Sequence, residues 1–316
     1  MLRRTFNLAL LAAPVACATA GKQTRSWLER RTGHVTQLHK RGPSPGKWSP
    51  QPVPAGVTEV RYPSAGRELL AWFAAPQLAP GTRAPALLYF HGEFSFAAWD
   101  FRQVRTFLDA GYCVMTPSLR GENGNPGEFE LLHGELDDAC AAVRWLAARP
   151  EVDTTKIYTL GHSVGGGLSA LLALQPDLPV ACTASVGGIY TPTTFRRWAS
   201  DADTRDLVRF DAEDREETEL RVMGPHVAQL ERPHRAYVGL ADEGILANAR
   251  ALESRAAAIA APFTLTTVPG DHAQSLTPGI AAYLADLRGS WRPSRPARRQ
   301  GSAHERRSVK SHALLG

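Results

Sequence analysis

The chain has 316 residues, with 36 Lys and Arg against 31 Asp and Glu, a net charge of +5 and an isoelectric point near 9.2. The excess positive charge lies at the two ends. Residues 1–47 carry nine basic and one acidic side chain, residues 292–316 carry seven and one, and the 244 residues between them carry a net charge of −9. This sign disfavours a nucleic-acid enzyme built around a basic groove, because the part of the chain that can form a core is acidic.

Length and a hydrophobic fraction of 43% allow one large domain or two small ones. No run of about 18 apolar residues predicts a membrane span. Four cysteines are too few for a disulfide framework, and Cys113, Cys140 and Cys182 lie in apolar stretches typical of small core residues. Without a CxxC pair or a clustered His/Cys set, the sequence predicts no metal site.

The two ends have their own patterns. Met1–Ala20 is typical of an export signal, with Arg3 and Arg4 before an apolar stretch and small residues before Gly21. The arginine pair also matches a twin-arginine signature, so we expect a periplasmic or secreted protein. An ordinary secretory signal and an over-long start are the alternatives. Residues 21–55 are polar and rich in Pro and Arg, which predicts a linker, and residues 289–316 predict a basic disordered tail.

Between these ends, residues 56–288 alternate strand and helix patterns. A strand pair is followed by a continuous apolar run, ALLYF, typical of a strand buried on both faces. The expected strands are 57–62, 68–74, 86–90, 112–116, 157–160, 180–186, 235–240 and 263–268, and the expected helices are 99–110, 135–148, 165–174, 245–260 and 276–287. This alternation predicts an α/β domain with a mainly parallel sheet covered on both faces, whose ligands bind at the carboxyl ends of the strands.

Residues 190–232 break the alternation and predict a short helical cap. Nine of the nineteen residues from Asp201 to Glu219 are acidic, and this stretch has a net charge of −6, which disfavours an anionic substrate. The aromatic residues Tyr190, Phe195 and Trp198 are candidates for acyl-pocket walls or for ordinary cap packing.

A nucleophile motif stands between an expected strand and an expected helix. In Gly161–Gly165 (GHSVG), glycines flank a serine on a tight strand-to-helix turn that exposes the hydroxyl and points the helix N-terminus at it. A serine hydroxyl needs a base to accept its proton. His272, in the loop between the last strand and the last helix, is the predicted base.

The third member of the predicted triad orients the histidine ring. Asp242 follows the preceding strand by two residues, which is the expected place, while Glu243 and Asp271 are the alternative carboxylates. Asp271 is disfavoured because it would have to fold back onto the ring of its own neighbour. The resulting order, Ser163, Asp242, His272, is that of an α/β-hydrolase.

The oxyanion of the tetrahedral intermediate needs two preorganised donors. The Val164 N–H, directly after the nucleophile, is one. The Glu93 N–H, in the loop after the ALLYF strand, is the other, and His91 in the same loop is expected to brace it.

These residues resemble the α/β-hydrolase superfamily, and within it the catalytic domain of the prolyl oligopeptidase and dienelactone hydrolase branch. The resemblance spans about 56–288 and is also carried by Pro117–Gly124, by 135–146 and by 152–157. Arg120, in the first of these stretches, is expected to form a structural ion pair with Glu135 or Asp138. The expected linker is far too short for the β-propeller that the family peptidases usually carry, and the tyrosine that some of them use in the oxyanion hole has no clear counterpart in residues 91–94.

The sequence therefore predicts a serine hydrolase that cleaves an ester or other acyl bond through an acyl-enzyme, without a metal or organic cofactor. Its substrate is expected to be a small-molecule ester. A prolyl oligopeptidase-like peptidase acting on short peptides is the alternative within enzymes, and a catalytically silent binding protein of the cell envelope is the alternative from another class.

Overall fold

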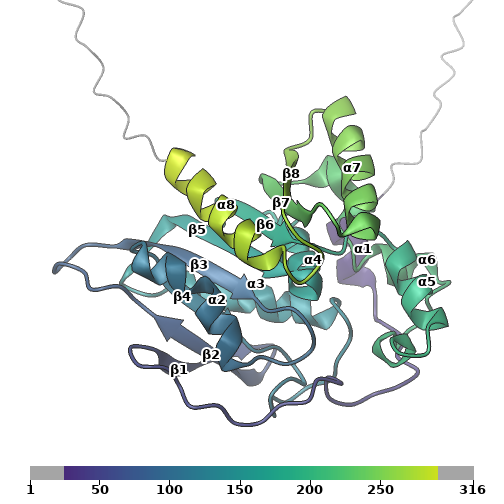
Figure 1. The fold of residues 1–316 in the computed structure, drawn as a ribbon. Helices are drawn as coiled ribbons and strands as arrows, with labels where there is room; N and C mark the ends of the chain where they lie inside the picture. Colours follow the sequence, from purple (N-terminus) through teal and green to yellow (C-terminus); the bar gives the residue numbers. More distant parts are fainter. Residues whose placement is uncertain (1–24, 291–316) are drawn as a thin grey trace, which may run out of the picture.

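The computed structural model describes residues 25–290, and its centre is an eight-stranded sheet (Figure 1). The strand order is β1-β2-β4-β3-β5-β6-β7-β8. Strands β3 to β8 pair in parallel, while β2 pairs antiparallel with both β1 and β4. The strands are β1 (Thr58–Ser64), β2 (Arg67–Ala74), β3 (Ala84–Phe90), β4 (Cys113–Pro117), β5 (Val152–His162), β6 (Cys182–Val186), β7 (His234–Gly239) and β8 (Phe263–Val268). The predicted α/β-hydrolase architecture is confirmed.

Helices cover both faces of this sheet. Helices α2 (Ala98–Asp109) and α8 (Leu276–Ser290) pack on one face, and α3 (Gly134–Ala147), α4 (Ser163–Leu172) and α7 (Glu243–Ala258) pack on the other. Strand β3 is buried along most of its length, as a strand between two helical layers must be.

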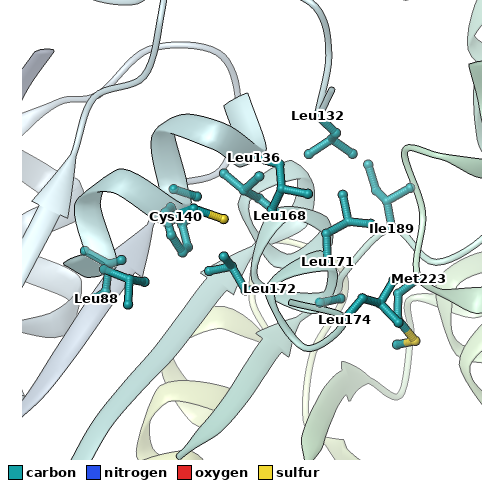
Figure 2. Close-up of a cluster of buried hydrophobic side chains, with 14 of the residues drawn as sticks. Leu88, Leu132, Leu136, Cys140, Leu168, Leu171, Leu172, Leu174, Ile189 and Met223 are labelled. Carbon is teal, nitrogen blue, oxygen red and sulfur yellow. The ribbon is translucent and has the colours of Figure 1, made fainter. Parts of the chain in front are cut away.

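The larger of the two apolar clusters lies between α3, α4 and the sheet. Figure 2 shows Leu136 and Cys140 of α3 close to Leu168 and Leu172 of α4. The small residues at the start of α4 allow this helix to approach its neighbours closely: a Cβ on Gly166 would lie 2.9 Å from the Gly188 Cα. Cys113, Cys140 and Cys182 are buried and free, as expected of core residues.

The expected break at 190–232 is a small helical insertion between β6 and β7. It comprises α5 (Thr193–Ser200), η1 (Arg205–Leu207), α6 (Arg215–Glu219) and η2 (Gly224–Gln229). Tyr190 and Phe195 are fully buried, and Phe195 packs edge-on against Trp198 and Phe210. Ordinary packing, the second of the two expectations for these aromatic residues, is what the structure shows.

The stretch predicted as a linker, 21–55, differs from that expectation over its described part. From residue 25 it forms a strap that begins with helix α1 (Trp27–Gly33) and is tied to the domain along its length. Arg30 pairs with Glu216 and Glu219 of α6, and further along, the Ser44 N–H donates to the Gly121 carbonyl at 2.9 Å. A polar, aperiodic sequence here is ordered by contacts with distant residues.

Replacing Trp27 by alanine is expected to destabilise the protein by about 3–5 kcal/mol, because its indole is 1% exposed and packs near His226 of the cap. Urea denaturation followed by circular dichroism measures this change. Trp48→Ala is the matched control in the same strap, since Trp48 is 48% exposed and its loss should cost far less. Equal losses in the two variants would contradict the packed position of α1.

The predicted ion pair of Arg120 is formed with Asp138. The guanidinium Nε and Nη2 donate to the two carboxylate oxygens at 2.8 and 2.9 Å, and the Arg120 backbone N–H donates to the same carboxylate. Both groups are buried.

None of the described helices has the length and apolar character needed to cross a membrane. The predicted export signal and nearly all of the predicted basic tail lie outside the described residues.

Candidate active site

Ser163 stands on a sharp turn between β5 and α4. Its φ is +53°, in the left-handed region that residues with a side chain rarely adopt. The turn closes tightly, because a Cβ on Gly161 would collide with the Gly165 carbonyl, and a Cβ on Gly165 would collide with the Phe90 and His91 carbonyls. Glycine is therefore required at both motif positions, as the G-x-S-x-G pattern predicts.

The three predicted triad residues lie together at the carboxyl ends of the strands. The Ser163 Oγ lies 3.0 Å from the His272 Nε2, and the His272 Nδ1 lies 2.6 Å from the Asp242 Oδ2. The His272 side chain is 41% exposed and the Asp242 side chain 11%. With Nδ1–H donated to a carboxylate, the ring presents the lone pair of Nε2 to the serine hydroxyl, which is the arrangement a general base requires.

The two alternative carboxylates lie elsewhere. The Asp271 side chain stabilises the turn that follows it, since its Oδ1 accepts hydrogen bonds from the N–H groups of Ala273 and Gln274. Glu243 is exposed at the first position of α7. Among the described residues, Asp242 is the only one of these three carboxylates that forms a hydrogen bond with the His272 ring.

The residues of the two predicted oxyanion donors line the same small cavity. Val164 is in the first turn of α4, where a backbone N–H has no partner within the helix. Glu93 is exposed, with a φ of +61°, and its N–H makes no hydrogen bond to any described residue. Both N–H groups are therefore available to a substrate carbonyl.

Two cavities open beside these groups. One, of about 190 Å³, contains the serine and histidine; its lining residues are Gly92, Glu93, Ser95, Trp99, Asp100, His162, Ser163, His272, Ala273 and Leu276. The other, of about 20 Å³, is largely apolar; its lining residues are Phe90, His91, Glu93, Phe94, Leu119, Glu122, Phe129, Leu132, Glu135, Val164, Gly165 and Leu168. Neither is lined by a residue of the cap 190–232, so the predicted cap does not form the walls of either cavity.

Two residues that sequence reasoning did not assign position the predicted base. The His162 Nε2 donates to the His272 carbonyl at 3.1 Å, and the two rings lie 5.1 Å apart. Burial lowers the pKa of His162, which keeps its ring neutral. Gly187, with a φ of +58°, follows β6, and a Cβ there would lie 3.0 Å from the His272 ring. Both residues could have been singled out from the sequence, since His162 belongs to the G-x-S-x-G motif and Gly187 directly follows an expected strand.

The smaller cavity has a buried acid at its wall. Glu135 is 3% exposed; its Oε1 accepts the Glu130 N–H at 2.7 Å, while its Oε2 has no partner among the described residues. Burial raises the pKa of Glu135 to about 8, against the opposing effects of the Glu130 N–H and Arg120. The carboxyl is therefore protonated at neutral pH.

This protonation makes stability depend on pH. The unfolded chain releases the Glu135 proton above its ordinary pKa of 4.5, whereas the folded protein keeps it until about pH 8. The Glu135 contribution therefore lowers stability as the pH rises between these values. In Glu135→Gln, which does not titrate, the melting temperature should fall less between pH 5 and 8 than in the wild type. Glu59→Gln, at an exposed position of β1, should follow the wild type, and parallel curves for all three proteins would contradict the prediction.

Among the described residues, no group of three His, Cys, Asp or Glu side chains is arranged to hold a metal ion.

Known proteins similar to this chain include uncharacterised proteins, and the solved structures similar to it include peptidases and esterases. An uncharacterised protein of Mycobacterium tuberculosis (strain CDC 1551 / Oshkosh) is 28% identical over 198 residues, which is 60% of this chain and 68% of the relative. The acylaminoacyl peptidase of Pyrococcus horikoshii superposes with a TM-score of 0.60 at 17% identity, covering 73% of this chain and 41% of that one. The esterase of Pyrobaculum calidifontis superposes with a TM-score of 0.56 at 16% identity, covering 84% and 88%.

At these identities the superpositions show a common fold. The chain spans about two fifths of the acylaminoacyl peptidase but most of the esterase. The family described as X-Pro dipeptidyl-peptidase (S15 family) matches residues 33–198, just over half of the chain, including the serine motif. This chain is a serine hydrolase of the α/β-hydrolase superfamily, and it belongs to the S15 family.

Proposed function

We propose that this chain hydrolyses esters of short acyl groups through an acyl-enzyme on Ser163. The observation that supports this most directly is the chain of contacts from the Ser163 Oγ to the His272 Nε2 and from the His272 Nδ1 to Asp242. In this proposal, the serine oxygen attacks the ester carbonyl as its proton passes to His272. The N–H groups of Val164 and Glu93 hold the resulting oxyanion.

The second half of the reaction uses the same groups. His272 gives its proton to the departing alkoxide, and the alcohol leaves. His272 then takes a proton from a water molecule that attacks the acyl-enzyme, and it returns this proton to the Ser163 oxygen as the acyl bond breaks, which releases the carboxylic acid and restores the serine.

The two cavities suggest where each part of the substrate binds. The leaving group must receive its proton from His272, so it occupies the cavity of about 190 Å³ that this ring lines. The acyl group extends the other way, past Val164, toward the apolar cavity of about 20 Å³. A cavity of that size has room for about one small group, which favours acetyl and propionyl over long acyl chains.

Peptidase activity on short peptides is the second candidate. The S15 family match favours it, since the family is described by X-Pro dipeptidyl-peptidase activity. An amide needs the same nucleophile, base and oxyanion donors as an ester, so the site geometry serves both.

A substrate screen with active-site labelling tests the proposal. A fluorophosphonate probe should form one adduct at Ser163, located by mass spectrometry, whereas a silent binding protein would form none. Turnover of p-nitrophenyl acetate should exceed that of p-nitrophenyl octanoate. If Gly-Pro-4-nitroanilide were turned over faster than any ester, the proposed esterase activity would be wrong and the chain would act as a peptidase.

A further inference from the structure

His91 is buried directly behind the oxyanion loop, and both nitrogens of its ring face an acceptor. The Nδ1 lies 2.8 Å from the carbonyl oxygen of Gly92, and the Nε2 lies 3.1 Å from the Oε2 of Glu122. The side chain is 3% exposed and that of Glu122 is 5% exposed. A neutral imidazole has one N–H and would satisfy only one acceptor, whereas an imidazolium donates to both.

The surroundings of the ring favour the charged form. The same Oε2 of Glu122 also accepts the Leu119 N–H at 2.7 Å, so it is held as an acceptor. The other ionisable groups near the ring are Asp100 of α2, Glu93 in the same loop and Glu135, which lines the same small cavity. Burial opposes the charge, but Glu122 and Asp100 outweigh it and raise the pKa of His91 to about 9.

The carbonyl that His91 contacts belongs to a particular peptide group. Gly92 C=O and Glu93 N–H are the two ends of one peptide bond, and the Glu93 N–H is the proposed oxyanion donor. A hydrogen bond to a peptide oxygen draws electrons toward that oxygen and leaves the N–H more positive, because the amide is delocalised. A cationic donor has a larger effect than a neutral one.

We propose that His91 is an imidazolium at neutral pH that polarises the Gly92–Glu93 peptide and so strengthens the Glu93 N–H as an oxyanion donor. His91 is a positioning residue in this scheme, since it acts through a backbone group and touches no reacting atom. The proposal goes beyond bracing of the loop, which a neutral ring could also provide. It rests on the proposed function for its effect on rate, but the charge of the ring is measurable without any substrate.

The charge is tested by nitrogen NMR of protein labelled with ¹⁵N-histidine, with His91 assigned from its loss in His91→Gln. At pH 7.5 the proposal requires imidazolium shifts on both ring nitrogens, changing to those of a neutral ring near pH 9. His226→Gln, at a buried histidine in the cap, should leave these signals unchanged. A neutral His91 at pH 7.5 would overturn the proposal, whether or not the protein hydrolyses esters.

The effect on rate is tested by the pH dependence of kcat/KM for p-nitrophenyl acetate, corrected for spontaneous hydrolysis. The wild type should lose about tenfold as the pH rises through 9, a fraction of the 10²–10³ that loss of a whole donor costs. His91→Gln should be about tenfold slower at pH 8 and show no further alkaline loss. In Glu122→Gln, the fall in kcat/KM at alkaline pH should occur at a lower pH than in the wild type. If the wild-type rate stayed constant to pH 10 and the defect in His91→Gln did not depend on pH, His91 would only brace the oxyanion loop.

Discussion

Replacing Ser163 by alanine is expected to lower kcat/KM for p-nitrophenyl acetate by about 10⁴-fold or more, to the level that binding and the oxyanion donors alone supply. The reason is that no acyl-enzyme can form without the Oγ, which lies 3.0 Å from the His272 Nε2. Alanine fits the turn sterically, so the fold should persist, with an unchanged circular dichroism spectrum and melting temperature. Initial rates and fluorophosphonate labelling of the purified variant measure the loss.

Ser95→Ala is the matched control for this variant. Ser95 lines the same cavity as Ser163, but its Oγ donates to the Lys47 carbonyl at 3.0 Å and faces the strap. Its loss should leave fluorophosphonate labelling intact. Turnover by Ser163→Ala at more than about a hundredth of the wild-type rate would mean that another group is the nucleophile.

The site residues could be predicted from the sequence because the topology fixes their order. In a parallel sheet, the loops that follow neighbouring strands meet at one edge. The turn after β5, the turn after β7 and the loop after β8 carry Ser163, Asp242 and His272 to that edge. Position in the chain therefore predicted proximity in space, and the structure brings these three side chains together.

The strap could not be predicted in the same way. Residues 25–55 have no apolar period, so their composition resembles that of a linker. Their order comes from pairing with groups that are about 180 residues away: Arg30 with Glu216 of α6, and the Gln37 N–H with the buried Glu217. Contacts at such separation leave no local signal in the sequence.

This pairing also changes the interpretation of the acidic cap. The net charge of −6 over Asp201–Glu219 suggested a field that repels anionic substrates. In the structure, Arg30 lies between Glu216 and Glu219, and Lys40 lies near Asp206. Part of the basic N-terminal excess therefore neutralises the cap, and neither cavity is lined by cap residues. The acidic stretch consequently carries little information about the substrate.

Replacing Asp242 by asparagine is expected to lower kcat by about 10⁴-fold while leaving the fold intact. The carboxylate accepts a hydrogen bond from the His272 Nδ1 at 2.6 Å, which fixes the tautomer with a free lone pair on Nε2. An amide NH₂ at that position would donate to Nδ1 instead and place the ring proton on Nε2, facing Ser163. That tautomer cannot accept the serine proton. Single-turnover acylation rates measure the loss directly.

Two further variants decide whether this loss belongs to Asp242 alone. Glu243→Gln changes the exposed carboxylate next to Asp242, and Asp271→Asn changes the one next to His272. Asp271 organises the turn through the N–H groups of Ala273 and Gln274, contacts that the asparagine oxygen can still accept. Both variants should therefore keep acylation within about tenfold of the wild type. If Asp271→Asn lowered the acylation rate as much as Asp242→Asn, Asp242 would not be the only carboxylate that orients His272 during the reaction.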